Sequence, residues 1–275
     1  MIARTRSDGT ALLRLSLYSI QRERRQHILI QIKMIVYGSY LSQPTRLVLW
    51  TCALRNIPVE LKRVDAGAGE QRTPEFLKMN PNAVFPVLED KSSGFILYES
   101  NAIARYLCGE TSNLYPKDAK VRALVDQWLE WKHGALRQGC AGIVRRRVMK
   151  NLMKDYTKHS MAQVFVEVKE EREARQVLEA LQILEDQLAK TKSYLVQGTS
   201  EPTLADLAVF EEVEQLRMLP STEGAPFGSK LDDKFPNVVS WQGRLRQLPK
   251  YDEIHKDLIM TVKKLEQMRQ KSSKM

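Results

Sequence analysis

Hydrophobic positions along this 275-residue chain follow two different periods, and the change falls near residue 115. From Ile35 onward, short β-branched and aromatic runs alternate with stretches of helical spacing. The predicted elements are, in order, a strand at 35–37, a helix at 44–55, a strand at 59–64, a short helix opened by Thr73-Pro74, strands in "FPVLED" and "FILY", and a helix at 100–107. This order of β-α-β, short α, β-hairpin and α predicts a compact α/β unit.

Beyond the loop "GETSNLYPKDAK" the strand pattern stops. Apolar residues from Val121 to Val144 keep the spacing of one helical face. In "PTLADLAVF", Thr203 and Asp206 fit a capping box with Asp in place of Glu. Further helices are predicted at 161–190, 204–218, 236–247 and 251–269. The chain is therefore divided into an extension (1–33), an α/β domain (34–112), an all-helical domain (118–262) and a basic tail (263–275).

The net charge of +10 lies mainly at the two ends of the chain. Residues 1–33 carry +5 and residues 262–275 carry +4, which leaves about +1 for the body between them. A nucleic-acid-binding protein would present this charge on a folded face, so we expect no nucleic-acid partner. No apolar run approaches the roughly 18 residues of a membrane span, so we expect a soluble protein with no membrane partner.

The three cysteines, Cys52, Cys108 and Cys140, are widely spaced and form no CxxC pair. No histidine pattern suited to zinc lies near them. We therefore expect reduced intracellular thiols and no metal site.

The two ends of the chain carry conflicting targeting signals. Residues 1–33 are Arg-rich and acid-poor, as in a mitochondrial transit peptide, but their leucines alternate instead of following helical spacing. Met34, directly before the first strand, allows the alternative that the extension lies upstream of the true start. The C-terminal Ser-Lys-Met is close to the peroxisomal address Ser-Lys-Leu. The prediction is a cytoplasmic protein, with peroxisomal import as the second option and mitochondrial import as the third.

Polar residues with chemical potential fall where predicted strands end. Ser42, in "YGSYLSQPTR", stands where the first strand turns into a helix, and it either caps that helix or holds a reactive group. Pro86, in "NAVFPVLED", is either an edge-strand proline or a cis proline. In the cis case the backbone of Phe85 turns outward and can pair with an extended, peptide-like ligand.

Two further pairs suit the charged ends of such a ligand. Ser100 either caps the last helix of the α/β unit or, together with Glu99, binds an amino-acid zwitterion. A helix N-terminus favours the carboxylate, and the adjacent Glu binds the ammonium. Gln71 and Arg72, in "GEQRT", are either solvated loop residues or the receivers of a second carboxylate, by amide donation and by charge.

These residues carry a resemblance to the glutathione transferases. The first domain resembles the thioredoxin-like domain of that family, and "YLSQPTR" is similar to the "LSQP-x-R" stretch of the theta class. The segments "VDAGAGEQRTPEFLKMNP", "AVFPVL", the "ES" pair, "YPKD" and "VDQWLEWKHGALRQGC" follow in register, so the likeness covers about residues 35–260. It implies a thioredoxin-like N-terminal domain followed by a helical-bundle C-terminal domain.

The resemblance also implies glutathione as the co-substrate. The γ-glutamyl end would bind Glu99 and Ser100, and the cysteinyl amide would pair with the backbone of Phe85. The glycine carboxylate would meet Gln71 and Arg72, although theta members often carry a histidine and a lysine there. Phe85 likewise replaces a smaller β-branched residue, and these departures leave the substrate range open.

The sulfur of that glutathione would lie near Ser42. A free cysteine thiol has a pKa of about 8.5. A hydrogen bond donated by Ser42 and the positive end of the following helix would both favour the thiolate. Tyr37 and Tyr40 are rival donors, but Tyr37 falls inside the strand and is expected to pack, whereas Tyr40 is expected to border the second-substrate site.

The helical domain is expected to supply the rest of the second-substrate site. Arg137 stands where theta-class enzymes carry an arginine that faces the sulfur, and the alternative is an exposed helix arginine. Trp128 and Trp131 are expected to pack in the core, and the run of arginines at 145–147 to be solvated or to face a second subunit.

The predicted function is a homodimeric glutathione transferase that conjugates glutathione to small electrophiles or reduces organic hydroperoxides. The alternative hypothesis is a non-catalytic protein of the same fold, acting as a carrier for hydrophobic ligands or as a docking module.

Overall fold

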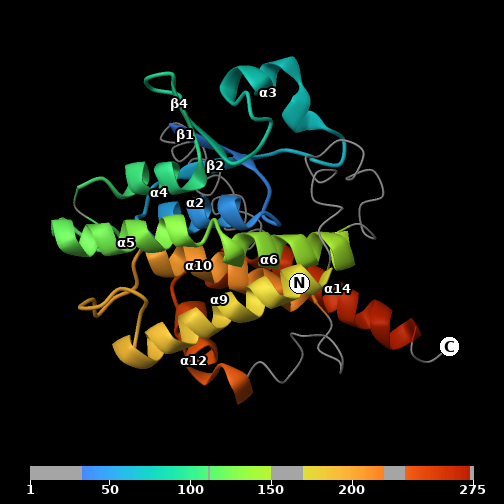
Figure 1. Cartoon of the computed structure of the whole chain (residues 1–275). Helices are drawn as coiled ribbons and strands as arrows, with labels where there is room; N and C mark the ends of the chain where they lie inside the picture. The colour runs from blue at the N-terminus through green and yellow to red at the C-terminus, as the bar shows by residue number, and fades with distance from the viewer. Residues whose placement is uncertain (1–32, 111, 150–169, 220–232, 273–275) are drawn as a thin grey trace, which may run out of the picture.

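The computed structural model describes residues 33–110, 112–149, 170–219 and 233–272 (Figure 1). The extension up to residue 32, the Ser-Lys-Met terminus and the start of the helix predicted at 161–190 lie outside the described residues.

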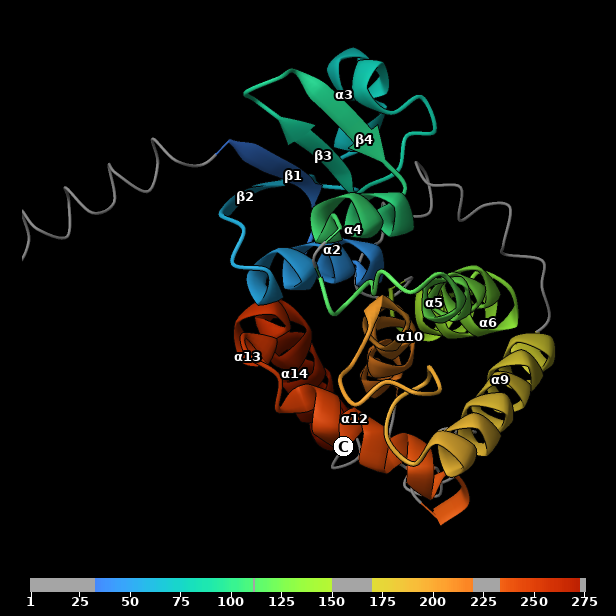
Figure 2. The same cartoon turned by 90° about the vertical axis from the view of Figure 1, so that its left-hand side faces the viewer.

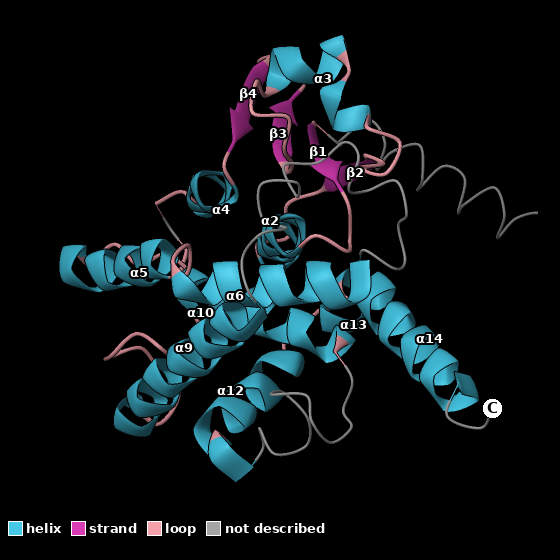
Figure 3. Ribbon diagram, turned by 45° about the vertical axis from the view of Figure 1, so that its right-hand side comes forward, coloured by secondary structure: helices cyan, strands magenta, loops and turns pink. Residues whose placement is uncertain are grey.

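The N-terminal domain is built on a four-stranded sheet with the strand order β2-β1-β3-β4. Its strands are β1 (Met34–Gly38), β2 (Val59–Arg63), β3 (Val87–Asp90) and β4 (Phe95–Tyr98). Strand β1 pairs in parallel with β2 and antiparallel with β3, which in turn pairs antiparallel with β4. Helices α2 (Gln43–Leu54) and α4 (Ser100–Cys108) cover one face of the sheet, and α3 (Pro74–Met79) lies on the other (Figure 3). The thioredoxin-like fold is confirmed.

Local sequence signals start two of these helices. The Ser42 Oγ accepts a hydrogen bond from Thr45 N, and the Thr73 Oγ1 accepts one from Phe76 N, each at 3.4 Å. Both helices also carry a proline in their first turn, where a missing N–H costs nothing. Helix α4 differs from the prediction by one position, because Glu99 is the N-cap and Ser100 is already the first helical residue.

The second domain is helical throughout the part that the structure describes. Its helices are α5 (Ala119–Trp131), α6 (Ala135–Val144), the π-helical turn η2 (Arg145–Met149), α9 (Glu170–Thr191), α10 (Leu204–Glu214), the 3-10 turn η4 (Gln215–Met218), α12 (Pro236–Arg246), α13 (Tyr251–Ile254) and α14 (Lys256–Ser272). Every residue of α10 is buried, because α2, α5, α6 and α12 surround it (Figure 2).

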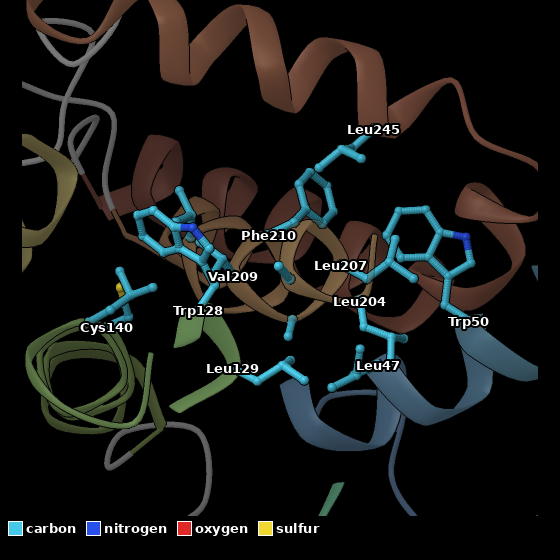
Figure 4. Packing of buried hydrophobic residues seen from close by; sticks show 14 of the residues in the cluster. Leu47, Trp50, Trp128, Leu129, Cys140, Leu204, Leu207, Val209, Phe210 and Leu245 are labelled. Atoms are coloured by element: carbon cyan, nitrogen blue, oxygen red, sulfur yellow. The ribbon is translucent and has the colours of Figure 1, made fainter. Parts of the chain in front are cut away.

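The core joins the two domains. Trp50 of α2 and Phe210 of α10 lie 5.5 Å apart between ring centroids, so the α/β domain packs directly on the central helix (Figure 4). Trp128 is buried and contacts the half-buried Trp131 at 4.9 Å, as predicted for packing residues. All three cysteines are buried and unpaired with one another. None of the described helices is long and apolar enough to cross a membrane.

Two predictions about the helical domain were wrong. The face expected to run on from Val121 breaks between Trp131 and Ala135, and the helix expected at 251–269 divides at His255. Helix α14 runs on to Ser272, through the described part of the segment predicted to be a basic tail. It does so because Leu265 is buried and Arg269 Nη2 donates to the carbonyl of Met218 at 2.7 Å.

Candidate functional site

The strand register places the predicted polar residues at one end of the strands, which we call the site edge of the sheet. Tyr37 of β1 lies opposite Val87 of β3, which lies opposite Tyr98 of β4, and Gly38 lies opposite Arg63 of β2. The edge therefore holds the ends of β1, β2 and β4 and the start of β3. The segments that carry Ser42, Gln71-Arg72, Phe85-Pro86 and Glu99-Ser100 all join the sheet at this edge.

Ser42 lies at the N-terminus of α2, half-buried, with an extended backbone. Its Oγ uses one lone pair to accept the capping bond from Thr45 N. A serine hydroxyl carries two lone pairs and one hydrogen, so the O–H can still donate to a ligand. The α2 dipole adds a positive potential at the same place. Ser42 can therefore cap the helix and stabilise an anion, so the two alternatives from the sequence are compatible.

Gly38 fixes the start of the loop that leads to Ser42. A Cβ at this position would lie 2.6 Å from Thr45 Oγ1, closer than any real contact, so only glycine fits between β1 and α2. This close approach brings the end of the strand against the first turn of the helix.

The two tyrosines that rival Ser42 have other partners. Tyr37 is buried and donates to Glu89 Oε2 at 2.7 Å. Tyr37 belongs to a buried cluster, which confirms that it packs, and burial and this hydrogen bond raise its pKa to about 12. The Tyr40 ring lies near the Arg63 guanidinium at 5.6 Å, and burial and the nearby Glu253 raise the pKa of Tyr40. Its role beside a second substrate stays a prediction.

The peptide bond between Phe85 and Pro86 is cis, as one of the two sequence alternatives predicts. Pro86 is buried directly before β3, and Phe85 packs against a small cluster that includes Tyr37, Phe76 and Val87. The aromatic side chain is thus used for packing, which leaves the backbone of Phe85 as the group that can pair with a ligand.

Glu99 has a φ of 71° and is exposed, although it is not a glycine. Such a backbone is unfavourable by about 1–3 kcal/mol and is typical of functional sites. It turns the chain from β4 into α4, so that the buried Ser100 stands in the first turn of the helix beside the Glu99 carboxylate. The pair offers a carboxylate next to a helix N-terminus, as the zwitterion hypothesis requires.

Gln71 and Arg72 lie in a short 3-10 turn, η1 (Glu70–Arg72). Arg72 is exposed, but Gln71 is only 5% exposed, which contradicts its alternative reading as a solvated loop residue. The buried Gln71 Oε1 has no hydrogen-bond partner among the described residues. A buried acceptor without a partner is costly, so the Oε1 of Gln71 is suited to a donor, while its Nε2 is the atom that can donate to a carboxylate.

Arg137 forms an ion pair with the buried Glu212 at 2.5 Å and keeps 26% of its side chain exposed. Lys132 Nζ lies 3.9 Å from the same carboxylate and is almost fully buried. Burial alone raises the pKa of Glu212, but Arg137 and Lys132 bring it below its ordinary value. The role of Arg137 toward a substrate stays a prediction, and its ion-pair partner among the described residues is Glu212.

Burial lowers the pKa of Lys132 to about 8, although Glu212 opposes this shift. An unfolded lysine has a pKa of about 10.4, so between these values the folded state binds fewer protons and stability rises with pH. We expect the wild type to gain free energy of unfolding over Lys132→Met by up to about 1.4 kcal/mol per pH unit between pH 8 and 10. Urea unfolding at three pH values measures this. The wild type should show no such gain over Lys120→Met, in which an exposed lysine is replaced. If the unfolding free energies of wild type and Lys132→Met changed in parallel with pH, the prediction would be contradicted.

Comparison with known proteins decides the family. The protein-family model "Glutathione S-transferase, N-terminal domain" matches residues 36–113 of this chain, and the family model "Glutathione S-transferase, C-terminal domain" matches residues 149–249. Glutathione S-transferase theta-1 of Bos taurus is 32% identical over 215 residues, which cover 76% of this chain and 81% of that relative. The chain belongs to the glutathione S-transferase family.

Other relatives of this glutathione S-transferase agree. Glutathione S-transferase T1 of Arabidopsis thaliana is 28% identical over 82% of this chain and 89% of its own. The chain spans only 39% of the length of two further Arabidopsis thaliana relatives, Glutathione S-transferase T2 and T3. Among solved structures, the epsilon-class glutathione S-transferase from the housefly, Musca domestica, has a TM-score of 0.66 at 28% identity, covering 86% of this chain and 96% of that one. The resemblance to the family is confirmed, and several relatives carry the theta name.

The candidate site also contains residues that sequence reasoning missed. Asn101 Nδ2 donates to the carbonyl of Leu129 at 2.9 Å, so it fastens the N-terminus of α4 to α5. Arg46 is fully buried at the domain interface and touches the loop that carries Ser42. Its place in the quoted "LSQPTR" run was the one available signal, since its partners lie far along the chain.

Proposed function

We propose that this protein is a glutathione transferase in which Ser42 stabilises the thiolate of bound glutathione. The proposal is carried by the sheet register, which brings four polar segments to the edge where Ser42 caps α2. It is supported by the names of the relatives and by the solved glutathione transferase homolog from Drosophila mojavensis with bound glutathione, at a TM-score of 0.64 and 28% identity.

Each part of glutathione has a matching group in this proposal. The γ-glutamyl ammonium binds the Glu99 carboxylate, and its carboxylate binds at Ser100 on the N-terminus of α4. The cysteinyl amide pairs with the backbone of Phe85 before the cis Pro86. The glycine carboxylate binds the Gln71 amide and the Arg72 guanidinium. The sulfur then lies at the N-terminus of α2.

The chemistry follows from that last position. The thiol proton leaves to solvent, and the O–H of Ser42 donates to the thiolate that remains. The thiolate attacks an electrophilic carbon, a thioether bond forms, and the leaving group departs with its electron pair. With an organic hydroperoxide, the thiolate instead attacks the terminal oxygen, the O–O bond breaks to give the sulfenic acid, and the alkoxide takes a proton from solvent and leaves as the alcohol. A second glutathione then converts the sulfenic acid to a disulfide and water.

The experiment for this proposal is a binding and turnover panel on the purified chain. We expect glutathione to bind in calorimetry, a thiolate absorbance band to form near neutral pH, and turnover with at least one of an alkyl halide, an aryl halide and cumene hydroperoxide. Binding without a thiolate band and without turnover would favour the non-catalytic carrier. No binding of glutathione at all would refute the proposal that this protein is a glutathione transferase.

We also propose a homodimer, formed through the outer edge of the sheet. Strand β4 is the edge strand, and a set of large apolar side chains is exposed along it and on the neighbouring helices. The members are Phe95, Ile96, Tyr98, Tyr106 and Leu124. The Phe95 and Tyr106 rings contact each other at 5.3 Å, so the exposed apolar surface extends from β4 onto α4. Such a patch is typical of a protein–protein interface.

Phe95→Glu should convert the dimer to a monomer, because a charge at the centre of an apolar contact is costly to bury. Light scattering after gel filtration gives the mass directly. The matched control is Ile183→Glu on α9, where the side chain is 48% exposed but lies outside the patch, and this variant should remain dimeric. A wild-type mass equal to one chain would overturn the proposal.

A further inference from the structure

The backbone of the loop that carries Ser42 accepts hydrogen bonds from side chains of other elements. Within the loop, Ser42 N donates to the Ser39 carbonyl at 3.0 Å and Leu41 N donates to Ser39 Oγ at 3.3 Å. The carbonyls of Tyr40 and Leu41 accept from Arg46 Nη1 at 3.0 Å and from Gln215 Nε2 at 3.4 Å. The backbone just before Ser42 is therefore held by one side chain from α2 and one from η4 of the helical domain.

Arg46 joins this loop to the helical domain with three different nitrogens. Its Nη1 holds the Tyr40 carbonyl, its Nε donates to Glu211 Oε2 at 2.6 Å, and its Nη2 donates to Gln215 Oε1 at 2.9 Å. The side chain has no exposed surface. A guanidinium is planar with donors at fixed angles, so fixing Nε and Nη2 on the helical domain also fixes the direction of Nη1. Lysine offers a single nitrogen and cannot reproduce this geometry.

Glu211 is held in turn by His255, the residue at which the C-terminal helix divides. His255 Nδ1 lies 2.9 Å from the Tyr251 carbonyl, and Nε2 lies 3.0 Å from Glu211 Oε1. The His255 ring is packed between Trp50 and Tyr251, at 5.0 and 4.2 Å between centroids. The carboxylate of Glu211 thus lies between the Arg46 guanidinium and the His255 ring.

We propose that Arg46, oriented by Glu211 and Gln215, is the positioning residue for Ser42, so that the helical domain sets where the serine hydroxyl points. The inference rests on the proposed function of Ser42. Arg46 does not touch the sulfur; it acts through the backbone of residues 40–42. Such a positioning residue matters because a displacement of about 1 Å at a reacting group can cost about a hundredfold in rate.

The test compares Arg46→Lys with Arg246→Lys in the full chain. Arg246 also pairs with a buried glutamate of α10, Glu214, at 2.7 Å, but among the described residues it forms no hydrogen bond or ion pair with the Ser42 loop, so it serves as a matched control. We expect Arg46→Lys to lower kcat by about tenfold to a hundredfold and to change KM for glutathione about twofold at most, because the groups assigned to its two ends are untouched. The pKa of the bound thiol should rise toward that of free glutathione. Arg246→Lys should change none of these.

Hydrogen exchange of the peptide that covers residues 39–42 provides a readout independent of turnover. We expect faster exchange in Arg46→Lys and an unchanged rate in Arg246→Lys. If Arg46→Lys fails to fold, Gln215→Leu removes one loop hydrogen bond and one contact to Arg46 and should show the same changes in kcat and exchange, at smaller size. Unchanged kcat, thiol pKa and loop exchange in a less stable Arg46→Lys would overturn the inference. A wild type without a thiolate band would instead refute the role of Ser42, while the exchange data would still report on the loop.

Discussion

Replacing Ser42 with alanine should lower kcat about a hundredfold or more while leaving glutathione bound. In other enzymes, removing one oriented donor that faces a developing anion lowers kcat by about 10²–10³, and we expect a comparable loss here. The groups proposed for the two ends of the tripeptide lie on other segments, so the dissociation constant for glutathione should change little. The pKa of the bound thiol should rise, because the α2 dipole alone would then favour the thiolate.

Loss of the helix cap accompanies this substitution and must be separated from the loss of the donor. Removing an N-cap side chain costs about 1 kcal/mol of stability. Asp118→Ala is the matched control, since Asp118 caps α5 by accepting from Lys120 N and Val121 N at 3.0 and 2.9 Å, at a place without an assigned role in catalysis. The control should lose stability but keep kcat. Full turnover in Ser42→Ala would transfer the role to another donor, and Tyr40 would be the first to test.

Replacing Asp206 with alanine should be the most destabilising single change, by about 3 kcal/mol or more. The carboxylate is fully buried in the first turn of the central helix α10 and accepts four hydrogen bonds. Its donors are Thr203 N at 2.8 Å, Thr203 Oγ1 at 3.0 Å, Leu195 N at 2.9 Å and Trp241 Nε1 at 3.0 Å. The predicted capping box is confirmed by the first of these. Removing the acceptor leaves several donors buried and unpaired, each at a cost of about 1–3 kcal/mol.

Urea unfolding of Asp206→Ala and of Asp118→Ala separates this network from an ordinary cap. The exposed Asp118 accepts only two backbone bonds, so its removal should cost about 1 kcal/mol. A similar, small loss for both variants would mean that the Asp206 network contributes little beyond capping. Because the core is shared by the two domains, we expect Asp206→Ala to lower the stability of the whole chain in one transition.

Much of the fold could be predicted because its signals are local. The change from alternating strands to helical spacing, the prolines after Ser42 and Thr73, and the Thr203–Asp206 box each act within a few residues. Helix breaks were harder to predict, since the apolar positions resume in helical spacing after Lys132–Gly134, and no proline or glycine marks the division at His255.

The sequence allowed the residues of the candidate site to be predicted, but it said much less about their burial and their partners. Its residues were found because strand ends, a proline and helix starts mark them in the sequence. The burial of Gln71 and Lys132 depends on elements packed from elsewhere in the chain, so the polar character of these residues gave no sign that they are buried. Arg46, Glu211 and His255 are 44 to 209 positions apart in sequence yet meet in the core, and the sequence gives no sign of such a meeting. Helix α10 is buried along its whole length, so its Glu211 can find charged or polar partners only on the helices packed around it.

A crystal structure of the chain with glutathione bound tests the central claim most directly. We predict the sulfur within hydrogen-bond reach of Ser42 Oγ, at about 3.5 Å or less, with the γ-glutamyl end at Glu99 and Ser100. A sulfur turned away from Ser42, with the tripeptide otherwise seated along the same sheet edge, would contradict the account.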